Sequence, residues 1–265
     1  LGTARALLAK AGAREALGDA TVVALAGATG SGKSTLFNAL SGSDVSSPGV
    51  RRPTTGVTHA SVWGGHDSPA RPTDRLLDWL EVPRRHRVEG GGSSLDGLVL
   101  LDLPDHDSVK LEHRLEVDRL VELVDVLVWV LDPQKYADAA VHDRYLAPLA
   151  GHAGVLVVVL NQVDRLDEAA AAACLADLRR LLDAEGLAGV PVVPVSARAG
   201  AGLPDLRRLL EKRVAERRAA TDRLTADARG AARSLGAHCG GAAGTVSADP
   251  SDDLVEALAG AAGVP

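Results

Sequence analysis

The chain has few aromatic residues, few cysteines and no methionine. It holds 3 Trp, 2 Tyr and 1 Phe among 265 residues, too few for a surface that stacks the bases of single-stranded nucleic acid. We therefore do not expect this chain to bind nucleic acid by itself. Its 2 cysteines cannot form a disulfide framework, which predicts a reduced, intracellular compartment. Because residue 1 is not Met, we expect the chain to be part of a longer product.

The sequence also lacks a strong net charge and a long hydrophobic run. With 29 Lys and Arg against 35 Asp and Glu, the net charge of −6 gives no strong attraction to nucleic acid or anionic lipid. The longest strongly apolar run without a charge, residues 153–163, is well short of the ~20 residues that cross a bilayer. A hydrophobic share of 46% is that of an ordinary globular chain, with a core of Leu, Val and Ala.

Short apolar runs alternate with stretches of helical periodicity. The expected strands lie at residues 21–26, 57–63, 98–101, 126–131, 155–160 and 190–195. The expected helices lie at residues 35–41, 73–80, 109–124, 137–150, 167–184 and 203–218. The alternation predicts an α/β fold with a doubly wound, mostly parallel sheet.

This α/β domain is expected at residues 21–215, with further segments around it. We expect an N-terminal helix at residues 1–20 and an insertion on the rim at residues 64–94, which are rich in Gly, Pro and Ser. Residues 219–265 are rich in Ala and predict an appended α-helical region that is interrupted by a Gly-rich break. We expect this region to be truncated at its end.

The first predicted strand runs into a phosphate-binding pattern, G-x-x-x-x-G-K-S, at residues 27–34. Its glycines let the backbone curl so that N–H groups face a phosphate, and the following helix adds its positive N-terminal end. Lys33 is expected to reach the β- and γ-phosphates, and the Ser34 hydroxyl to bind Mg²⁺. The residues expected at the nucleotide from this loop are Gly27, Thr29, Gly30, Ser31, Gly32, Lys33, Ser34 and Thr35.

Two later strand ends point to guanine as the base. The Asp164 carboxylate can accept hydrogen bonds from the guanine N1–H and exocyclic amine, whereas adenine lacks that amine. A backbone N–H at residues 196–198 can meet the guanine carbonyl. Both segments follow strands, where open α/β sheets bind ligands. The expected base-binding residues are Asn161, Gln162, Asp164, Ser196, Ala197 and Arg198.

With these motifs in this order, residues 21–215 resemble an Era-like small GTPase domain of the translation-factor class of P-loop GTPases. They are similar to bacterial Era-like GTPases predicted to be membrane-associated. The resemblance implies GTP or GDP and Mg²⁺ as ligands. It also implies a location at the cytoplasmic face and a membrane attachment through a segment beyond Pro265.

The resemblance extends to two switch motifs. The second motif resembles R-R-P-T-T at residues 51–55, where one threonine closes over the γ-phosphate and Mg²⁺; we prefer Thr55 and leave Thr54 open. The third motif begins at Asp102, which would hold Mg²⁺ through its water shell. The implied metal set is Ser34, Thr54 or Thr55, and Asp102.

Two positions depart from the family pattern. Asp105 replaces the glycine of the third motif, and two unit charges ~6 Å apart repel by about 3 kcal/mol at an effective dielectric near 20. Gln162 replaces the lysine whose stem lies along the base, so we expect guanine selectivity with some loss of affinity. His106 resembles the histidine that positions water in translation GTPases. The alternative interpretation is that His106 is a solvated loop residue without a catalytic role.

These observations favour a GTP-binding protein that hydrolyses GTP slowly and acts as a switch or assembly factor. Its catalytic residues would be Lys33, Thr55 and His106. One alternative is a GTP- or GDP-binding adaptor with negligible hydrolysis, which Asp105 favours. Another is an ATP-using P-loop protein, against which Asp164 counts. The sequence names no protein partner.

Overall fold

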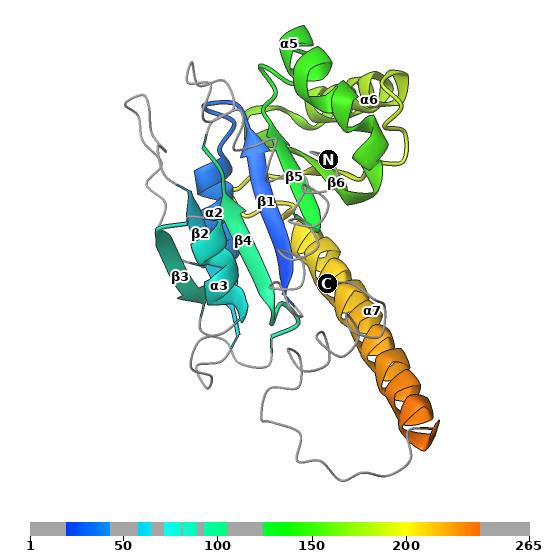
Figure 1. The fold of residues 1–265 in the computed structure, drawn as a ribbon. Coiled ribbons are helices and arrows are strands. Elements are labelled where there is room, and N and C mark those ends of the chain that lie inside the picture. The colour runs from blue at the N-terminus through cyan, green and yellow to red at the C-terminus, as the bar shows by residue number, and fades with distance from the viewer. Residues whose placement is uncertain are drawn as a thin grey trace. The chain divides into compact units, whose positions relative to one another are not determined.

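The structure is a computed structural model that describes residues 20–42, 58–64, 72–80, 82–88, 93–104 and 124–238. Seven strands form one sheet in the order β3-β2-β4-β1-β5-β6-β7 (Figure 1). Only β2 and β4 pair antiparallel. The expected α/β fold with a mostly parallel sheet is therefore confirmed. The strands are β1 Thr21–Gly27, β2 His59–Trp63, β3 Arg84–Val88, β4 Leu98–Asp102, β5 Val126–Leu131, β6 Leu156–Leu160 and β7 Val192–Pro194.

Helices cover both faces of the sheet. On one face, α2 (Lys33–Ser41) and the first part of α7 (Leu203–His238) pack against the strands. On the other face lie α3 (Pro72–Trp79), α5 (Ala139–Val141) and α6 (Glu168–Ala184). Successive side chains of a strand point to opposite faces, so both faces of the central strands must be apolar. This explains the uninterrupted apolar runs of β1, β5 and β6.

The segment expected as a rim insertion contributes a strand to the sheet. Its sequence, R-R-H-R-V at residues 84–88, has no apolar alternation, so periodicity did not predict β3. Strand β3 pairs parallel with β2 and forms the outer edge. As a result β2 lies inside the sheet between β3 and β4.

The helix expected at residues 137–150 is broken into three pieces. The short α5 is followed by a π-helix, η1 (His142–Leu146), and a 3₁₀ helix, η2 (Ala147–Val155). Pro148 stands at the start of η2, where it cannot donate an α-helical hydrogen bond. A short 3₁₀ turn, η3 (Val163–Arg165), follows β6.

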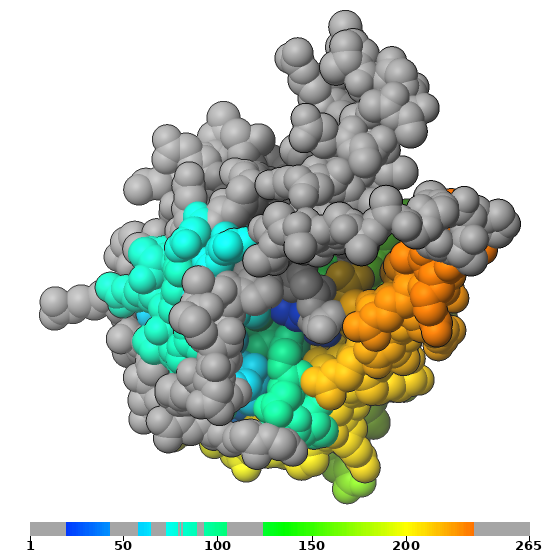
Figure 2. Space-filling model, turned by 60° about the horizontal axis from the view of Figure 1, so that its bottom comes forward, coloured from blue at the N-terminus to red at the C-terminus, as the bar shows by residue number. Residues whose placement is uncertain are grey.

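Helix α7 continues beyond residue 218, where we expected it to end. The chain divides into two compact units, Leu1–Ala219 and Ala220–Pro265, with the boundary inside this helix. In the first unit, Ser94 Oγ donates to Glu211 Oε1 at 2.6 Å, and Arg218 donates to the Asp96 carbonyl at 3.0 Å. Figure 2 shows the segment leading into β4 beside this part of α7.

Several expected segments lie wholly or almost wholly outside the described residues. They are the helices at residues 1–20 and 109–124 and the end of the chain after residue 238. Among the helices that the structure describes, none is both long and apolar enough to cross a membrane.

Candidate nucleotide-binding site

Four loops meet at the carboxyl ends of the central strands. They follow β1, β5, β6 and β7, which are neighbours in the sheet (Figure 1). Open α/β sheets bind ligands at this edge. Asp102 ends β4 at the same edge and lies opposite Leu25 of β1 in the ladder. The phosphate-binding pattern and the two base motifs predicted from the sequence are therefore brought together.

The loop at residues 28–32 has a backbone that glycine makes possible. Gly30 and Gly32 have φ angles of 85° and 89°, in the left-handed region that L side chains rarely adopt. A Cβ atom on Gly32 would lie 2.4 Å from Asn161 Nδ2. The curl of the loop, and its close approach to the loop after β6, both depend on the missing side chain.

Five successive carbonyl groups, from Gly27 at the end of β1 to Ser31 in this loop, accept hydrogen bonds from side chains. Lys33 Nζ donates to the carbonyls of Gly27 (2.7 Å) and Ala28 (3.3 Å), and Lys135 Nζ donates to that of Thr29 (3.2 Å). Gln162 Nε2 donates to the carbonyl of Gly30 (2.7 Å), and Asn161 Nδ2 donates to that of Ser31 (2.9 Å). In a trans peptide the N–H points opposite to the carbonyl. Holding the carbonyls of Thr29 and Ser31 therefore turns the N–H groups of Gly30 and Gly32 the other way. This is the arrangement of a loop that binds a phosphate through its N–H groups.

The residues expected at the phosphates and Mg²⁺ are partly described. Lys33 is buried, with 4% of its surface exposed, and Asp102 is fully buried at the end of β4. Ser34 lies in the first turn of α2. A hydroxyl and a carboxylate are oxygen donors of the kind that Mg²⁺ prefers, so these two side chains fit the ion. Thr54, Thr55, Asp105 and His106 lie outside the described residues.

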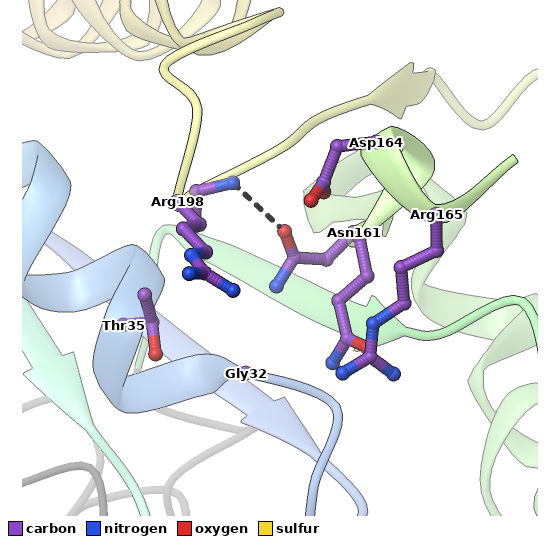
Figure 3. A pocket seen from close by; sticks show the side chains of 8 residues that line it. Gly32, Thr35, Asn161, Asp164, Arg165 and Arg198 are labelled. Atoms are coloured by element: carbon purple, nitrogen blue, oxygen red, sulfur yellow. Dashed lines mark hydrogen bonds between the residues drawn. The ribbon is translucent and has the colours of Figure 1, made fainter.

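A pocket of about 170 Å³ lies next to the phosphate loop (Figure 3). Arg198 stands on one side of Asn161, and Asp164 and Arg165 stand on the other. All three charged side chains belong to exposed residues, so they can meet a ligand. The lining residues are Gly32, Thr35, Asn161, Gln162, Asp164, Arg165, Ala197 and Arg198.

Asn161 joins three loops through one carboxamide. Its Oδ1 accepts the Ala197 N–H at 3.0 Å, and its Nδ2 donates to the Ser31 carbonyl at 2.9 Å. The residue is only 2% exposed. In this structure Asn161 and the Ala197 N–H bind each other, and their role in reading the base stays a prediction. Asn161 positions the loops on either side of it, and the exposed Asp164 lines the pocket.

Gln162 also contacts the phosphate loop rather than extending along the pocket. Its φ angle is 62°, and it has the only positive φ among the described non-glycine residues. The carboxamide Nε2 donates to the Gly30 carbonyl. The expected loss of affinity from Gln162 stays a prediction, and in this structure the side chain contacts the phosphate loop.

Ser196 positions the last of the four loops. It is fully buried, its Oγ accepts the Ala199 N–H at 3.0 Å, and its N–H donates to the Ala201 carbonyl at 2.9 Å.

The sequence patterns did not predict two residues of the site, Arg165 and Lys135. Both follow the carboxyl end of a buried strand within five residues, and this position was the signal that could have found them.

Comparison with known proteins identifies a family. Residues 22–162 match the family described as 50S ribosome-binding GTPase. No curated protein matches the sequence. The structure is similar to Era from Aquifex aeolicus bound to GDP and AlF4⁻, with 21% identity, a TM-score of 0.50, and coverage of 72% of this chain and 56% of that one.

Two further similar structures are informative about the fold. A structure of Era with MgGDPNP and part of 16S ribosomal RNA has 22% identity and a TM-score of 0.50, covering 73% of this chain and 56% of that one. One protein of a bacterial dynamin pair, described as sensing and tethering membranes, has 14% identity and a TM-score of 0.57, covering 80% and 48%. The chain thus spans about half the length of these proteins.

The similar structures support the P-loop GTPase fold. They do not support our expectation that this chain does not bind nucleic acid by itself, since one of the Era structures contains RNA. The family match covers more than half of the chain and includes the phosphate loop and the start of the first base motif. This protein therefore belongs to the family of GTPases described as 50S ribosome-binding GTPases.

Proposed function

We propose that this chain binds GTP and GDP with Mg²⁺ and hydrolyses GTP slowly, acting as a switch or assembly factor. One observation carries the proposal: Asn161 holds the phosphate loop and the loop after β7 together beside the pocket that Asp164 lines. A ligand with a base in that pocket would have its phosphates at the adjacent loop.

Asp164 would select guanine. Its carboxylate offers two acceptor oxygens, which match the adjacent N1–H and exocyclic amine of guanine. Adenine presents an acceptor at N1, so a carboxylate there would face another lone pair. A charge-assisted pair of hydrogen bonds is stronger than a neutral pair. The selectivity would therefore come from this residue.

Lys33 would move from the carbonyls of Gly27 and Ala28 to the β- and γ-phosphates, because an ammonium binds a phosphate more strongly than a neutral carbonyl. Ser34 and Asp102, with Thr54 or Thr55, would hold Mg²⁺. Bound there, the ion neutralises charge on the β- and γ-phosphates. Thr55 is proposed to close over the γ-phosphate and Mg²⁺, and His106 to position the attacking water.

Slow hydrolysis is proposed because of Asp105. A carboxylate in place of the family's glycine opposes the negative γ-phosphate and lacks the freedom of a glycine backbone. Unassisted GTPases already turn over at about 10⁻⁴ to 10⁻³ per second. We place this chain at or below that range.

Phosphate release under multiple-turnover conditions tests the proposal against its alternatives. We expect Mg²⁺-dependent release from GTP, none from ATP, and loss of release in Lys33→Ala. Lys212→Ala is the matched control, because Lys212 is 76% exposed on α7 and should leave the rate unchanged. GDP binding without release would identify the adaptor. Equal release from ATP would identify an ATP-using protein and contradict the proposal.

A further inference from the structure

We propose that Lys135 supplies a second cation to the terminal phosphates of the bound nucleotide, beside Lys33. The inference rests on the proposed function, since it assigns a role to a residue of the same site. It concerns a position that none of the sequence motifs includes.

Lys135 contacts the phosphate loop in its middle. Its Nζ donates to the Thr29 carbonyl at 3.2 Å, while Lys33 Nζ contacts the carbonyls of Gly27 and Ala28. Two ammonium groups thus meet adjacent carbonyls of one loop. Thr29 directly precedes Gly30, whose N–H points opposite to the Thr29 carbonyl. Lys135 Nζ therefore lies across one peptide from the N–H side of the loop, and it would leave the carbonyl for a phosphate as Lys33 would.

The backbone that carries Lys135 is fixed on both sides. Asp132, which is 5% exposed, accepts the N–H groups of Gln134 (2.9 Å) and Lys135 (3.2 Å) through Oδ1. On the other side, the Tyr136 carbonyl accepts from His142 Nε2 at 2.6 Å. A cation on a fixed backbone loses less conformational entropy when it binds than one on a mobile loop.

Tyr136 adds a second anchor for this loop. Its hydroxyl donates to Asp177 Oδ2 on α6 at 3.1 Å. Burial, followed by the contacts with Asp177 and Cys174, raises the pKa of Tyr136 to about 12. The hydroxyl therefore keeps its proton, and this anchor persists at any physiological pH.

The ammonium of Lys135 has capacity for a ligand. In the part of the chain that the structure describes, no carboxylate forms an ion pair with it, and the Oδ1 of nearby Asp132 accepts backbone N–H groups. An ammonium has three donors, and its contact with Thr29 uses one. The residue is half-buried, where a charge gains more from an anionic partner than it does in open solvent.

A second cation would favour GTP over GDP. The triphosphate carries more negative charge than the diphosphate, and charge shifts toward the bridging oxygen as the terminal bond breaks. The ammonium of Lys135, once turned from the Thr29 carbonyl to the terminal phosphate, would act on that charge directly. Lys135 would thus do from within the chain what a partner's arginine does in trans in other GTPases.

Lys135 could instead only position the loop through its hydrogen bond to Thr29, and two substitutions separate the roles. Lys135→Gln keeps an N–H donor for the Thr29 carbonyl and removes the charge. Lys135→Arg keeps both. Lys212→Gln on α7 is the control for loss of one exposed charge.

The experiment measures the affinities of the full chain for GDP and for a non-hydrolysable GTP analogue, and the formation of a complex with GDP, Mg²⁺ and AlF4⁻. We expect Lys135→Gln to bind GDP nearly as the parent does, which also shows that it folds. Its affinity for the GTP analogue should fall roughly 10-fold or more, and the AlF4⁻ complex should be lost. Lys135→Arg and Lys212→Gln should behave like the parent.

A Lys135→Gln protein with the parent's GTP-to-GDP affinity ratio and an intact AlF4⁻ complex would overturn the inference and leave the proposed function standing. A Lys135→Gln protein that loses GDP and GTP affinity equally would also overturn it, by showing a positioning role. A parent chain that binds neither guanine nucleotide would instead contradict the proposed function itself.

Discussion

Gly32 and Asn161 touch so closely that a Cβ atom on Gly32 would lie 2.4 Å from Asn161 Nδ2. The same Nδ2 holds the carbonyl of Ser31, the residue before this glycine. The phosphate loop and the base loop therefore pack together without room for a methyl group. We expect changes at this contact to affect both ends of a bound nucleotide.

The first prediction compares two glycines of the phosphate loop. Gly30 and Gly32 share a positive φ, but a Cβ on Gly30 would meet nothing within 4 Å. Gly30→Ala should weaken GDP binding only by the ~1–3 kcal/mol of backbone strain that a side chain adds at a positive φ. Gly32→Ala adds a clash with Asn161, so its GDP affinity should fall at least a further 10-fold. Equilibrium GDP titration of both variants measures the difference; equal losses would show that the Asn161 contact does not matter.

The second prediction concerns the two ends of the Asn161 carboxamide. Asn161→Asp keeps an acceptor for the Ala197 N–H but places an oxygen against the Ser31 carbonyl. An unsatisfied or repelled buried group costs about 1–3 kcal/mol, which corresponds to roughly a 5- to 150-fold loss of GDP affinity. Asn161→Asp should therefore bind GDP less tightly than the parent in calorimetric titration. Parent-like affinity would mean that the loops stay in place without this bridge.

The third prediction is about stability and uses two glycines in the loop after β7. Gly202 has a φ of 72°, and a Cβ there would lie 2.0 Å from the Pro194 carbonyl oxygen; Gly200 has a φ of 81° and open space. Gly200→Ala should reduce the free energy of unfolding by about 1–2 kcal/mol. Gly202→Ala should reduce it by more, because backbone must move. Urea unfolding of the two variants measures the difference. A Gly200→Ala protein less stable than Gly202→Ala would contradict the prediction.

The fourth prediction concerns acid. His59 is 4% exposed, and its Nδ1 has no hydrogen-bond partner among the described residues. Burial, with Arg84 and His86 adding to it, lowers the pKa of His59 below its usual value. Between about pH 6.5 and that lower pKa the unfolded chain binds the proton and the folded chain does not. The free energy of unfolding should therefore fall as the pH drops below about 6.5.

Variants of two histidines test this acid sensitivity. His59→Phe keeps a ring against Phe37 and His86 and should lose part of the difference in unfolding free energy between pH 7.5 and pH 5.5. His152→Phe changes an exposed histidine and should keep the parent's difference. The same pH dependence in His59→Phe and the parent would remove His59 as a cause.

Sequence patterns predicted the strands that are buried on both faces, because an apolar run such as β6 has no other stable environment in this fold. They missed β3 because its three arginines are tolerated only on an outer strand, where Arg85 and Arg87 pair with Asp78 and Asp74 of α3. These ion pairs form only when β3 and α3 meet in the folded chain, and the periodicity of the sequence does not predict that contact.

The sequence also predicted which residues gather at the site, but not which of them contact one another. Asn161 and Ala197 are 36 positions apart and bind each other, which only the register of β6 and β7 determines. Lys135 belongs to no phosphate-binding motif. Its contact with Thr29, 106 positions away, follows from the pairing of β1 with β5.

The central claim is that this chain binds guanine nucleotides through Asp164, and a competition titration with GDP and ADP tests it most directly. We predict that GDP binds at least 100-fold more tightly than ADP. Asp164→Asn should lower GDP affinity by about 30- to 1,000-fold, since the paired bonds contribute roughly 2–4 kcal/mol, and should improve binding of xanthosine diphosphate. Asp183→Asn, an exposed change on α6, should leave GDP affinity unchanged. Equal affinities for GDP and ADP, or an Asp164→Asn protein that binds GDP as the parent does, would contradict the claim.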